Sequence, residues 1–355
     1  MNSTKKNKRR IMKMYKKILA MLLVATMVML SACGGTTTSS TTAATTVAGE
    51  ASESSQAGGE SSEVYHIGIV QLVQHAALDQ ATQGFKDALV EALGDSVVFD
   101  EQNANGDAAT ATTICSNFVA EDVDLIMANA TAALQAAASA TGTIPILGTS
   151  ITDYGVALDI ADFSGVIGGN ISGTSDCAPL EQQAQMMLEL FPDANTFGIL
   201  YCSAEPNSKF QSDAVQAVLE AAGKTVSIYT FSDSNDLASV TQEACSNVEA
   251  IYIPTDNTAA SYTETINNVA QPAGIPIFAG EEGIMSGCGV ATLSISYYNI
   301  GKVTGQMAAE ILVDGADIST MEVRYDDEPV KEYNPVLSEA LGIAIPEDYL
   351  DYTTK

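Results

Sequence analysis

The sequence predicts an α/β fold made of two doubly wound lobes joined by a hinge. From Tyr65 onward, apolar segments of strand length alternate with Ala-rich segments of helical length, and this series occurs twice. Strands that alternate with helices of about 10–15 residues are typical of parallel sheets with right-handed crossovers. At roughly 150 residues per domain, the length of 355 residues also fits two domains.

The expected elements follow the chain in order. The first series predicts strands at 65–72, 97–102, 125–128, 145–148 and 165–171, with helices at 77–93, 108–120 and 132–140. The second series predicts strands at 196–201, 225–231, 250–254 and 276–279, with helices at 179–191, 207–222, 237–246 and 258–271. The last part of the chain predicts a strand at 291–296, a helix at 300–314 and a strand at 322–325.

The two series define the expected lobes. We expect residues 64–172, with about 288–320, to form the N-terminal lobe. We expect residues 173–287, with about 321–355, to form the C-terminal lobe. In such folds the ligand binds beyond the carboxyl ends of the strands, which indicates a site between the lobes.

Charge is unevenly distributed along the chain. Eight of the 15 Lys and Arg residues lie within the first 17 residues, so the remainder carries 7 basic against 44 acidic side chains, a net charge of −37. Arg324 is the only Arg in that remainder. Proteins that bind nucleic acid or anionic membrane surfaces need clustered cations. The composition therefore argues against both kinds of partner and limits how an anionic ligand group could be held.

Residues 1–32 have the pattern of a secretory signal peptide. A basic segment precedes the uncharged residues 18–30, a stretch shorter than the roughly 20 residues of a membrane-spanning helix. The stretch ends in Leu30-Ser31-Ala32-Cys33, which resembles the lipobox of bacterial lipoproteins. An ordinary signal peptide, or a signal anchor, with an incidental Cys is the alternative. We expect Cys33 to be the lipidated N-terminus, because the basic segment, the apolar stretch, the lipobox and a linker occur in this order. Two acyl chains on this Cys would anchor the protein stably to a membrane.

The segment after Cys33 is expected to be a disordered linker. Residues 34–63 are mainly Ser, Thr, Gly, Ala and Glu, with Val47 as the only larger aliphatic residue and no Lys or Arg. Such a segment cannot bury enough apolar surface to offset the entropy lost on ordering. Residues 33–63 would then hold the folded part of the chain away from the membrane.

Five further cysteines are interpreted as free thiols. None belongs to a C-x-x-C pair, no zinc-ligand spacing is present, and five cysteines cannot all pair with one another. A buried free Cys acts as a small hydrophobic residue. These cysteines are Cys115, Cys177, Cys202, Cys245 and Cys288.

Short polar residues follow the expected strands in both series. Helix N-termini at such positions carry unpaired N–H groups and partial positive charge, so they can hold a carboxylate. Ordinary helix capping uses the same residue types and is the alternative for each single residue. The candidate ligand-binding residues are Gln71, Leu72, His75, Ala130, Thr131, Thr149, Ser150, Tyr201, Asn207, Asp256, Asn257 and Glu281.

Several segments together resemble a known family. They include IVQLVQHAALD at 69–79, NANGD at 103–107, GTSD at 173–176, AIYIPTDN at 250–257 and PIFAGE at 276–281. In order over about residues 65–317, they resemble the solute-binding lipoproteins of bacterial ABC importers of the tryptophan/tyrosine-binding type. Tyr154 departs from the pattern, because the family commonly has Pro there; this Tyr could line the cleft or cover the lobe surface.

The resemblance implies a fold and a function. The fold would be type I periplasmic-binding-protein-like, with two Rossmann-like lobes that close on a ligand about a hinge. The protein would be a lipid-anchored component of an ABC importer on the extracytoplasmic face of the cell membrane. It would bind an aromatic amino acid, act as a monomer, and deliver its ligand to permease subunits with a cytoplasmic ATPase. A receptor of the same fold for a sugar, nucleoside or signal molecule is the alternative.

An amino acid could be held in such a cleft without an Arg–carboxylate pair. We expect its carboxylate at main-chain N–H groups and the hydroxyls of Thr131, Thr149 and Ser150. We expect its ammonium group at Asp256 or Glu281.

An aromatic side chain would need an apolar wall, for which the candidates are Leu72, Tyr201, Tyr297 and Tyr298; packing in the core or on the surface is the alternative for the tyrosines. No catalytic residue, metal site or cofactor is expected. The sequence contains no phosphate-binding loop, no G-x-S-x-G and no H-E-x-x-H motif.

Overall fold

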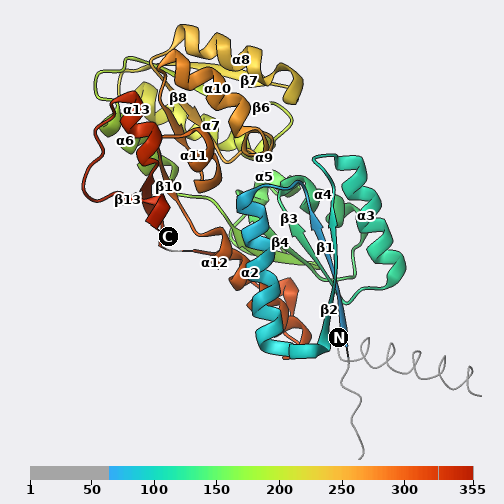
Figure 1. The fold of residues 1–355 in the computed structure, drawn as a ribbon. Coiled ribbons are helices and arrows are strands. Elements are labelled where there is room, and N and C mark those ends of the chain that lie inside the picture. The colour runs from blue at the N-terminus through green and yellow to red at the C-terminus, as the bar shows by residue number, and fades with distance from the viewer. Residues whose placement is uncertain (1–63, 327, 355) are drawn as a thin grey trace, which may run out of the picture. The chain divides into compact units, whose positions relative to one another are not determined.

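The computed structural model describes residues 64–326 and 328–354, which form two α/β lobes (Figure 1). The expected signal peptide at 1–32 and the expected linker at 33–63 lie outside the described residues, as does the expected lipidation site Cys33. Within the described part of the chain, no helix is both long enough and apolar enough to cross a membrane.

Lobe 1 is built on a six-stranded parallel sheet in the order β11-β5-β4-β3-β1-β2. Its strands are β1 (Tyr65–Gln71), β2 (Val97–Asn103), β3 (Leu125–Asn129), β4 (Ile146–Ile151), β5 (Ile171–Ser175) and β11 (Arg324–Tyr325). Its helices are α2 (Ala76–Leu93), α3 (Ala108–Glu121), α4 (Thr131–Ala140), α5 (Tyr154–Leu158) and α12 (Tyr297–Leu312).

Lobe 2 is built on a seven-stranded sheet in the order β13-β12-β10-β9-β8-β6-β7, parallel except for the β10–β12 pair. Its strands are β6 (Thr196–Cys202), β7 (Thr225–Phe231), β8 (Ala250–Ile253), β9 (Ile277–Ala279), β10 (Ala291–Ser294), β12 (Val330–Tyr333) and β13 (Leu350–Asp351). Its helices are α6 (Leu180–Leu190), α7 (Pro206–Ala221), α8 (Ser234–Asn247), α9 (Asn257–Ser261), α10 (Thr263–Ala273), α11 (Glu282–Cys288) and α13 (Pro335–Leu341).

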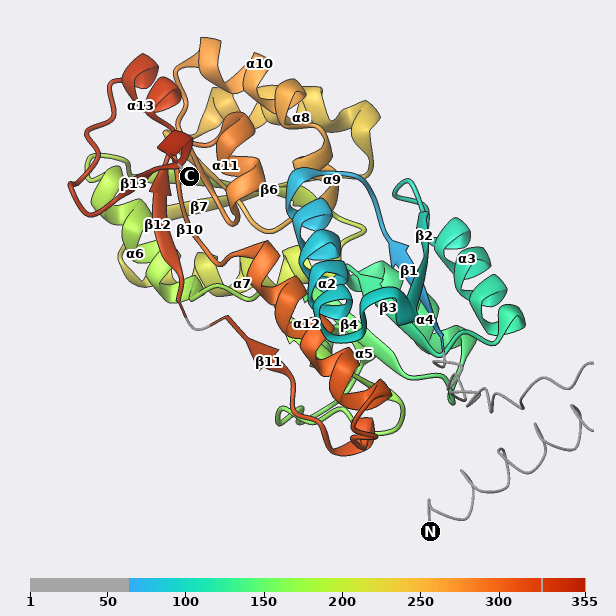
Figure 2. The same ribbon diagram turned by 60° about the horizontal axis from the view of Figure 1, so that its bottom comes forward.

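Apolar side chains from the strands and the covering helices form separate cores in the two lobes. Strands β1, β3 and β4 of lobe 1 are almost completely buried, as expected for parallel strands with helices on both faces. Helix α12 packs along α2 on one of these faces (Figure 2). Gly301 permits this close approach, because a Cβ there would collide with the main chain at Ala81.

The chain crosses between the lobes three times: between β5 and α6, between β10 and α12, and between β11 and β12. Hydrogen bonds connect these crossing segments. The hydroxyl of Tyr297 donates to Asp176 at 2.9 Å, and the main-chain N–H of Ser296 donates to Asp326 at 3.1 Å. The three segments therefore form a connected hinge, and the predicted fold of two doubly wound lobes joined by a hinge is confirmed.

The observed strands differ from the expected ones in two ways. Two strands belong to the other lobe than expected, and one strand lies at different residues. Strand β10 pairs with β9 and β12 in lobe 2, whereas the sequence places 288–320 in lobe 1. The strand expected at 165–171 lies instead at Ile171–Ser175, because Gly168 and Gly169 have φ values of +82° and +64° and form a turn. Strand β11, expected in the C-terminal lobe, pairs with β5 in lobe 1.

Several short elements do not follow from the sequence pattern. The helix expected at 258–271 is divided into α9 and α10. Helices α5, α11 and α13 and strands β12 and β13 were not expected; each has seven residues or fewer. The five cysteines of the described part are free, and all except Cys177 are buried, in agreement with the interpretation as free thiols.

Candidate functional site

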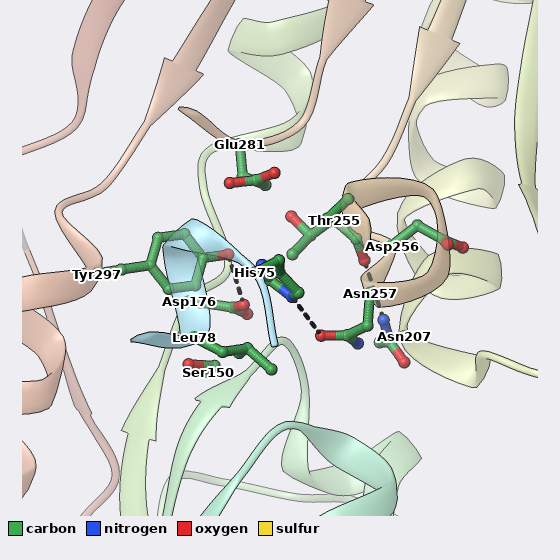
Figure 3. A pocket seen from close by; sticks show the side chains of 11 residues that line it. His75, Leu78, Ser150, Asp176, Asn207, Thr255, Asp256, Asn257, Glu281 and Tyr297 are labelled. Carbon is green, nitrogen blue, oxygen red and sulfur yellow. Dashed lines mark hydrogen bonds between the residues drawn. The ribbon is translucent and has the colours of Figure 1, made fainter. Parts of the chain in front are cut away.

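A pocket lies where the two lobes face each other, beyond the carboxyl ends of strands from both sheets (Figure 3). Its own side chains nearly fill it: the volume left is about 10 Å³, room for about one water molecule, so an amino acid can enter only when the lobes move apart. Its walls come from both lobes and from the hinge, and they include no Lys or Arg. The lining residues are His75, Leu78, Ser150, Asp176, Asn207, Thr255, Asp256, Asn257, Ala260, Glu281 and Tyr297.

Two residues at the ends of lobe 1 strands have a strained backbone. Ala130 has φ +86° and Ser150 has φ +57°, values that residues other than Gly rarely adopt. The Ser150 hydroxyl lines the pocket and is buried without a hydrogen-bond partner among the described residues. Ala130 precedes α4 and has no side chain that could cap it, so the first N–H groups of α4 lack a side-chain cap. This edge of lobe 1 is therefore suited to binding an anionic group.

Two pocket carboxyl groups on lobe 2 are helix N-caps. Asp256 accepts hydrogen bonds from the main-chain N–H groups of Ala259 and Cys202 and from the hydroxyl of Ser208, each at 2.8 Å. Glu281 accepts from two main-chain N–H groups in the first turn of α11. Both side chains are at least 98% buried. Their hydrogen bonds show that each carboxyl group has a structural role in lobe 2.

A third buried carboxyl group stands beside Asp256. Glu205 accepts from the main-chain N–H groups of Asn257 and Thr258, both at 2.9 Å, and so binds the start of α9. Burial raises the pKa of Asp256 to about 8, and the nearby charge of Glu205 contributes to the same shift. Burial also raises the pKa of Glu281 to about 7.

Asp176 differs from the lobe 2 carboxyl groups, because side-chain hydroxyls donate to both of its oxygens. Thr152 donates to its Oδ1 at 3.0 Å and Tyr297 donates to its Oδ2 at 2.9 Å. Burial raises the pKa of Asp176 to about 6, although both hydrogen bonds act in the opposite direction.

His75 links the lobes across the pocket. Its Nε2 lies 3.3 Å from the Oδ1 of Asn257, while its Nδ1 is buried without a partner among the described residues. Burial lowers the pKa of His75, despite the hydrogen bond to Asn257 and the nearby charges of Glu205 and Asp79. A neutral imidazole that donates from Nε2 to Asn257 leaves Nδ1 as a hydrogen-bond acceptor.

The structure brings six of the twelve candidate ligand residues together at the pocket. These are His75, Ser150, Asn207, Asp256, Asn257 and Glu281. Asn207 is held by its own neighbours, since its Nδ2 donates to the carbonyl of Thr255 at 3.0 Å.

Gln71 and Thr149 do not line the pocket, because their side chains are used inside lobe 1. Gln71 donates to Asp79 at 2.6 Å and accepts from Thr82 at 2.6 Å, which ties β1 to α2. The Thr149 hydroxyl accepts from Thr174 at 3.2 Å, beneath the pocket-facing edge.

The other four candidates are also not among the lining residues. Leu72 and Tyr201 are buried in the hydrophobic cores of lobe 1 and lobe 2. Ala130 and Thr131 are buried at the start of α4.

The sequence did not decide whether three tyrosines line the cleft, and the structure places each of them differently. Tyr297 lines the pocket. Tyr154 neither lines the cleft nor covers the lobe surface: it is completely buried in the lobe 1 core, where its hydroxyl donates to the carbonyl of Thr174 at 3.0 Å. Tyr298 donates to Asp87 at 2.9 Å between α12 and α2.

Sequence reasoning missed four lining residues: Leu78, Asp176, Thr255 and Ala260. Leu78, Asp176 and Thr255 lie within segments that carry the family resemblance, which was the available signal for them. No signal in the sequence distinguishes Ala260 from the other residues of its helix. Among the described residues, no group of three or more His, Cys, Asp or Glu side chains is arranged to hold a metal ion.

Comparisons with known proteins agree with this architecture. Residues 66–355 match the model of the ABC transporter substrate-binding protein family. The chain is 35% identical over 272 residues to the "Tyrosine-binding protein" of Clostridioides difficile strain R20291, an alignment that covers 76% of this chain and 78% of that protein.

Solved structures of relatives are similar over most of the chain, and two of them differ in their ligand state. An ABC domain from Streptococcus pneumonia in complex with L-Trp is 34% identical, with a TM-score of 0.77, over 80% of this chain and 97% of that one. A ligand-free, open substrate-binding protein with adhesive properties from Clostridium difficile is also 34% identical, with a TM-score of 0.63, over 81% and 99%. At equal identity, this chain superposes better on the L-Trp complex than on the open structure. This agrees with the direct contact between the lobes at His75 and Asn257.

Proposed function

Because the chain belongs to the family of ABC transporter substrate-binding proteins, we propose that it binds an aromatic amino acid between its lobes and delivers it to an ABC importer. The tyrosine-binding relative and the similar structure that contains L-Trp support this ligand class. The observation that carries the proposal is the pocket itself, which both lobes and the hinge line together.

The pocket offers separate contacts for the two charged groups of an amino acid. The free hydroxyl of Ser150 suits the carboxylate, and no Arg is needed. The buried carboxyl groups of the pocket suit the ammonium group. Leu78, Ala260 and the ring of Tyr297 supply apolar surface for the side chain.

Ligand binding would close the lobes about the hinge. A ligand that contacts both lobes interacts better with the closed state than with the open state, and this difference drives closure. We propose that the ligand is bound without chemical conversion and that the protein acts as a monomer. The partners in this proposal are permease subunits with a cytoplasmic ATPase.

We further propose that the protein is attached to the extracytoplasmic face of the cell membrane through a lipid on Cys33. Support comes from the sequence Leu30-Ser31-Ala32-Cys33 and the Ser/Thr-rich segment that follows it. Replacement of Cys33 by Ser should abolish incorporation of labelled palmitate and release the protein from the membrane fraction. If the variant still incorporated palmitate and remained in the membrane fraction, the proposed lipid anchor on Cys33 would be wrong.

The ligand class can be tested directly by fluorescence, because the chain contains no Trp. Emission excited at the long-wavelength edge of the indole band, where the 13 Tyr of the chain absorb little, would come from added L-Trp, and its anisotropy should rise on binding. A thermal-shift panel of amino acids, sugars and nucleosides should show stabilisation by Trp, Tyr or Phe. Stabilisation by a sugar or nucleoside alone would show that the proposed ligand class is wrong, and it would not contradict the proposed role in transport.

A further inference from the structure

Four buried side chains form a continuous chain of hydrogen bonds through the molecule, which we name the hinge relay. Gln211 donates to Thr152 at 3.2 Å, Thr152 donates to Asp176 at 3.0 Å, and Tyr297 donates to Asp176 at 2.9 Å. None of the four residues is more than 4% exposed.

The hinge relay connects parts of the molecule that move relative to one another on closure. Gln211 lies on α7 of lobe 2, and Thr152 directly follows β4 of lobe 1. Asp176 lies on the first crossing segment, and Tyr297 begins α12 directly after the second. The bond from Gln211 to Thr152 joins the two lobes, so it requires their close approach.

Asp176 is also a wall of the ligand pocket, where it is seen beside Tyr297 in Figure 3. Asp256 and Glu281 are fixed by main-chain N–H groups, whereas the two hydroxyls that hold Asp176 can rotate. No Lys or Arg lines the pocket, and burial favours the neutral form of His75. A buried carboxylate without a cation is costly, and a bound cation would stabilise it.

We propose that Asp176 binds the cationic group of the ligand and that the hinge relay couples this contact to closure of the lobes. The identity of the ligand as an amino acid rests on the proposed function. The assignment differs from the sequence expectation, which placed the ammonium group at Asp256 or Glu281.

The coupling follows from the direction of the hydrogen bonds. An ionised Asp176 accepts strongly from Thr152, which turns the Thr152 hydrogen toward the carboxylate. The lone pairs of the Thr152 hydroxyl then face Gln211 and can accept its amide hydrogen. A protonated Asp176 is a weaker acceptor and no longer fixes this orientation. The ligand's positive charge keeps Asp176 ionised and thereby favours the bond that joins the lobes.

A proton balance accompanies this contact. Burial holds the pKa of Asp176 at about 6 without ligand, so below that pH binding of the cation releases a proton. Affinity should therefore rise with pH up to about 6 and then level off. The titratable groups that face Asp176 from the surrounding elements are Tyr154, Cys177, Glu281 and Tyr297.

The test compares L-Trp with indole-3-propionate, which has the same ring and carboxylate but no amino group. Wild-type protein should bind L-Trp much more tightly, while Asp176→Asn should lose roughly 10- to 100-fold in L-Trp affinity and change little toward indole-3-propionate. Asp193→Asn removes one exposed carboxylate away from the pocket and is the matched control for charge. Glu281→Gln removes a different pocket carboxyl group. This variant should keep more of the preference for L-Trp over indole-3-propionate than Asp176→Asn does.

The outcomes separate this inference from the proposed function. If wild-type protein binds neither L-Trp nor L-Tyr, the ligand class is wrong. If wild-type protein binds L-Trp and Asp176→Asn keeps the full preference over indole-3-propionate, the role of Asp176 is wrong. A second measurement needs no variant: calorimetry of wild-type protein at about pH 5 in buffers of different ionisation enthalpy should show proton release on binding L-Trp. Binding without proton release would overturn the coupling.

Tyr297→Phe tests the hinge part of the relay. The variant keeps the aromatic ring but removes the hydroxyl that donates to Asp176. Small-angle scattering should show a smaller compaction on addition of L-Trp than for wild-type protein. An unchanged compaction, with unchanged affinity, would show that this hydroxyl does not couple binding to closure.

Discussion

The imidazole Nε2 of His75 lies 3.3 Å from the side-chain oxygen of Asn257, and these two residues belong to different lobes. His75 precedes α2 of lobe 1, and Asn257 begins α9 of lobe 2. The bond can form only when the lobes are close together, so it stabilises the closed state. Because His75 also lines the pocket, the same side chain can contact ligand through its free Nδ1.

His75→Ala should weaken ligand binding and favour the open state. Loss of one hydrogen bond between lobes corresponds to about 1 kcal/mol, or roughly a five-fold loss of affinity. The double variant with Asn257→Ala should lose less than the sum of the two single variants, because both remove one interaction. Affinities from L-Trp anisotropy would test this, and strict additivity would show that the two side chains act independently.

Stability of the ligand-free protein should decrease as pH rises from about 4 to about 8. The pKa values of Asp176, Glu281 and Asp256 are raised from 3.8, 4.5 and 3.8 to about 6, 7 and 8 in the folded state. The folded state therefore binds more protons than the unfolded state between these values. Their contribution to stability is fully present below about pH 4 and is lost as pH rises through about 6, 7 and 8 in turn.

Thermal unfolding of the ligand-free protein at a series of pH values would check this sign. We expect the melting temperature to fall between about pH 5 and pH 8, and Asp256→Asn to flatten the upper part of the curve. A melting temperature that rises over this interval would contradict the assignment of these carboxyl groups as neutral in the folded protein at low pH.

Gly173→Ala should destabilise lobe 1 severely. Gly173 has φ +151°, and a Cβ there would collide with the main chain of Gly148 and with the hydroxyl of Tyr154. The expected loss is at least about 3 kcal/mol in the free energy of unfolding. Gly142→Ala is the matched control, because nothing lies within 4 Å of a Cβ at that exposed position. Urea denaturation would compare the two, and equal stability would show that lobe 1 repacks around the methyl group.

Strand β5, which contains Gly173, shows why part of the fold could not be predicted from the sequence. The alternation of strands and helices predicts the long elements well, because buried parallel strands and amphipathic helices have distinct patterns. Strand β5 does not have such a pattern: its residues Ile171–Ser175 are small and mostly polar. Its position depends on pairing with β4 and β11, and β11 lies about 150 residues later. Asp176 directly follows β5, so misplacing the strand also hid this pocket residue.

For the site as well, the positions of several residues could be predicted from the sequence, whereas their roles could not. The strand-end rule brings Ser150, Asn257 and Glu281 to one pocket, because it depends on topology alone. This rule cannot tell which side chains already form hydrogen bonds within their own lobe. Asp256 and Glu281 accept hydrogen bonds from neighbouring main-chain N–H groups, and this geometry exists only after the helices have formed.

Ser150→Ala should weaken binding of ligands that carry a carboxylate and leave other ligands unaffected. The hydroxyl of Ser150 is buried and unpartnered among the described residues, so its removal exposes no protein group that needs a new partner. L-Trp affinity should fall by roughly five- to ten-fold, because a charge-assisted hydrogen bond to the carboxylate is lost. Tryptamine, which has no carboxylate, should bind both forms equally in a competition assay. Ser139→Ala, on the exposed face of α4, is the control. An equal loss for L-Trp and tryptamine would show that Ser150 shapes the pocket without contacting the carboxylate.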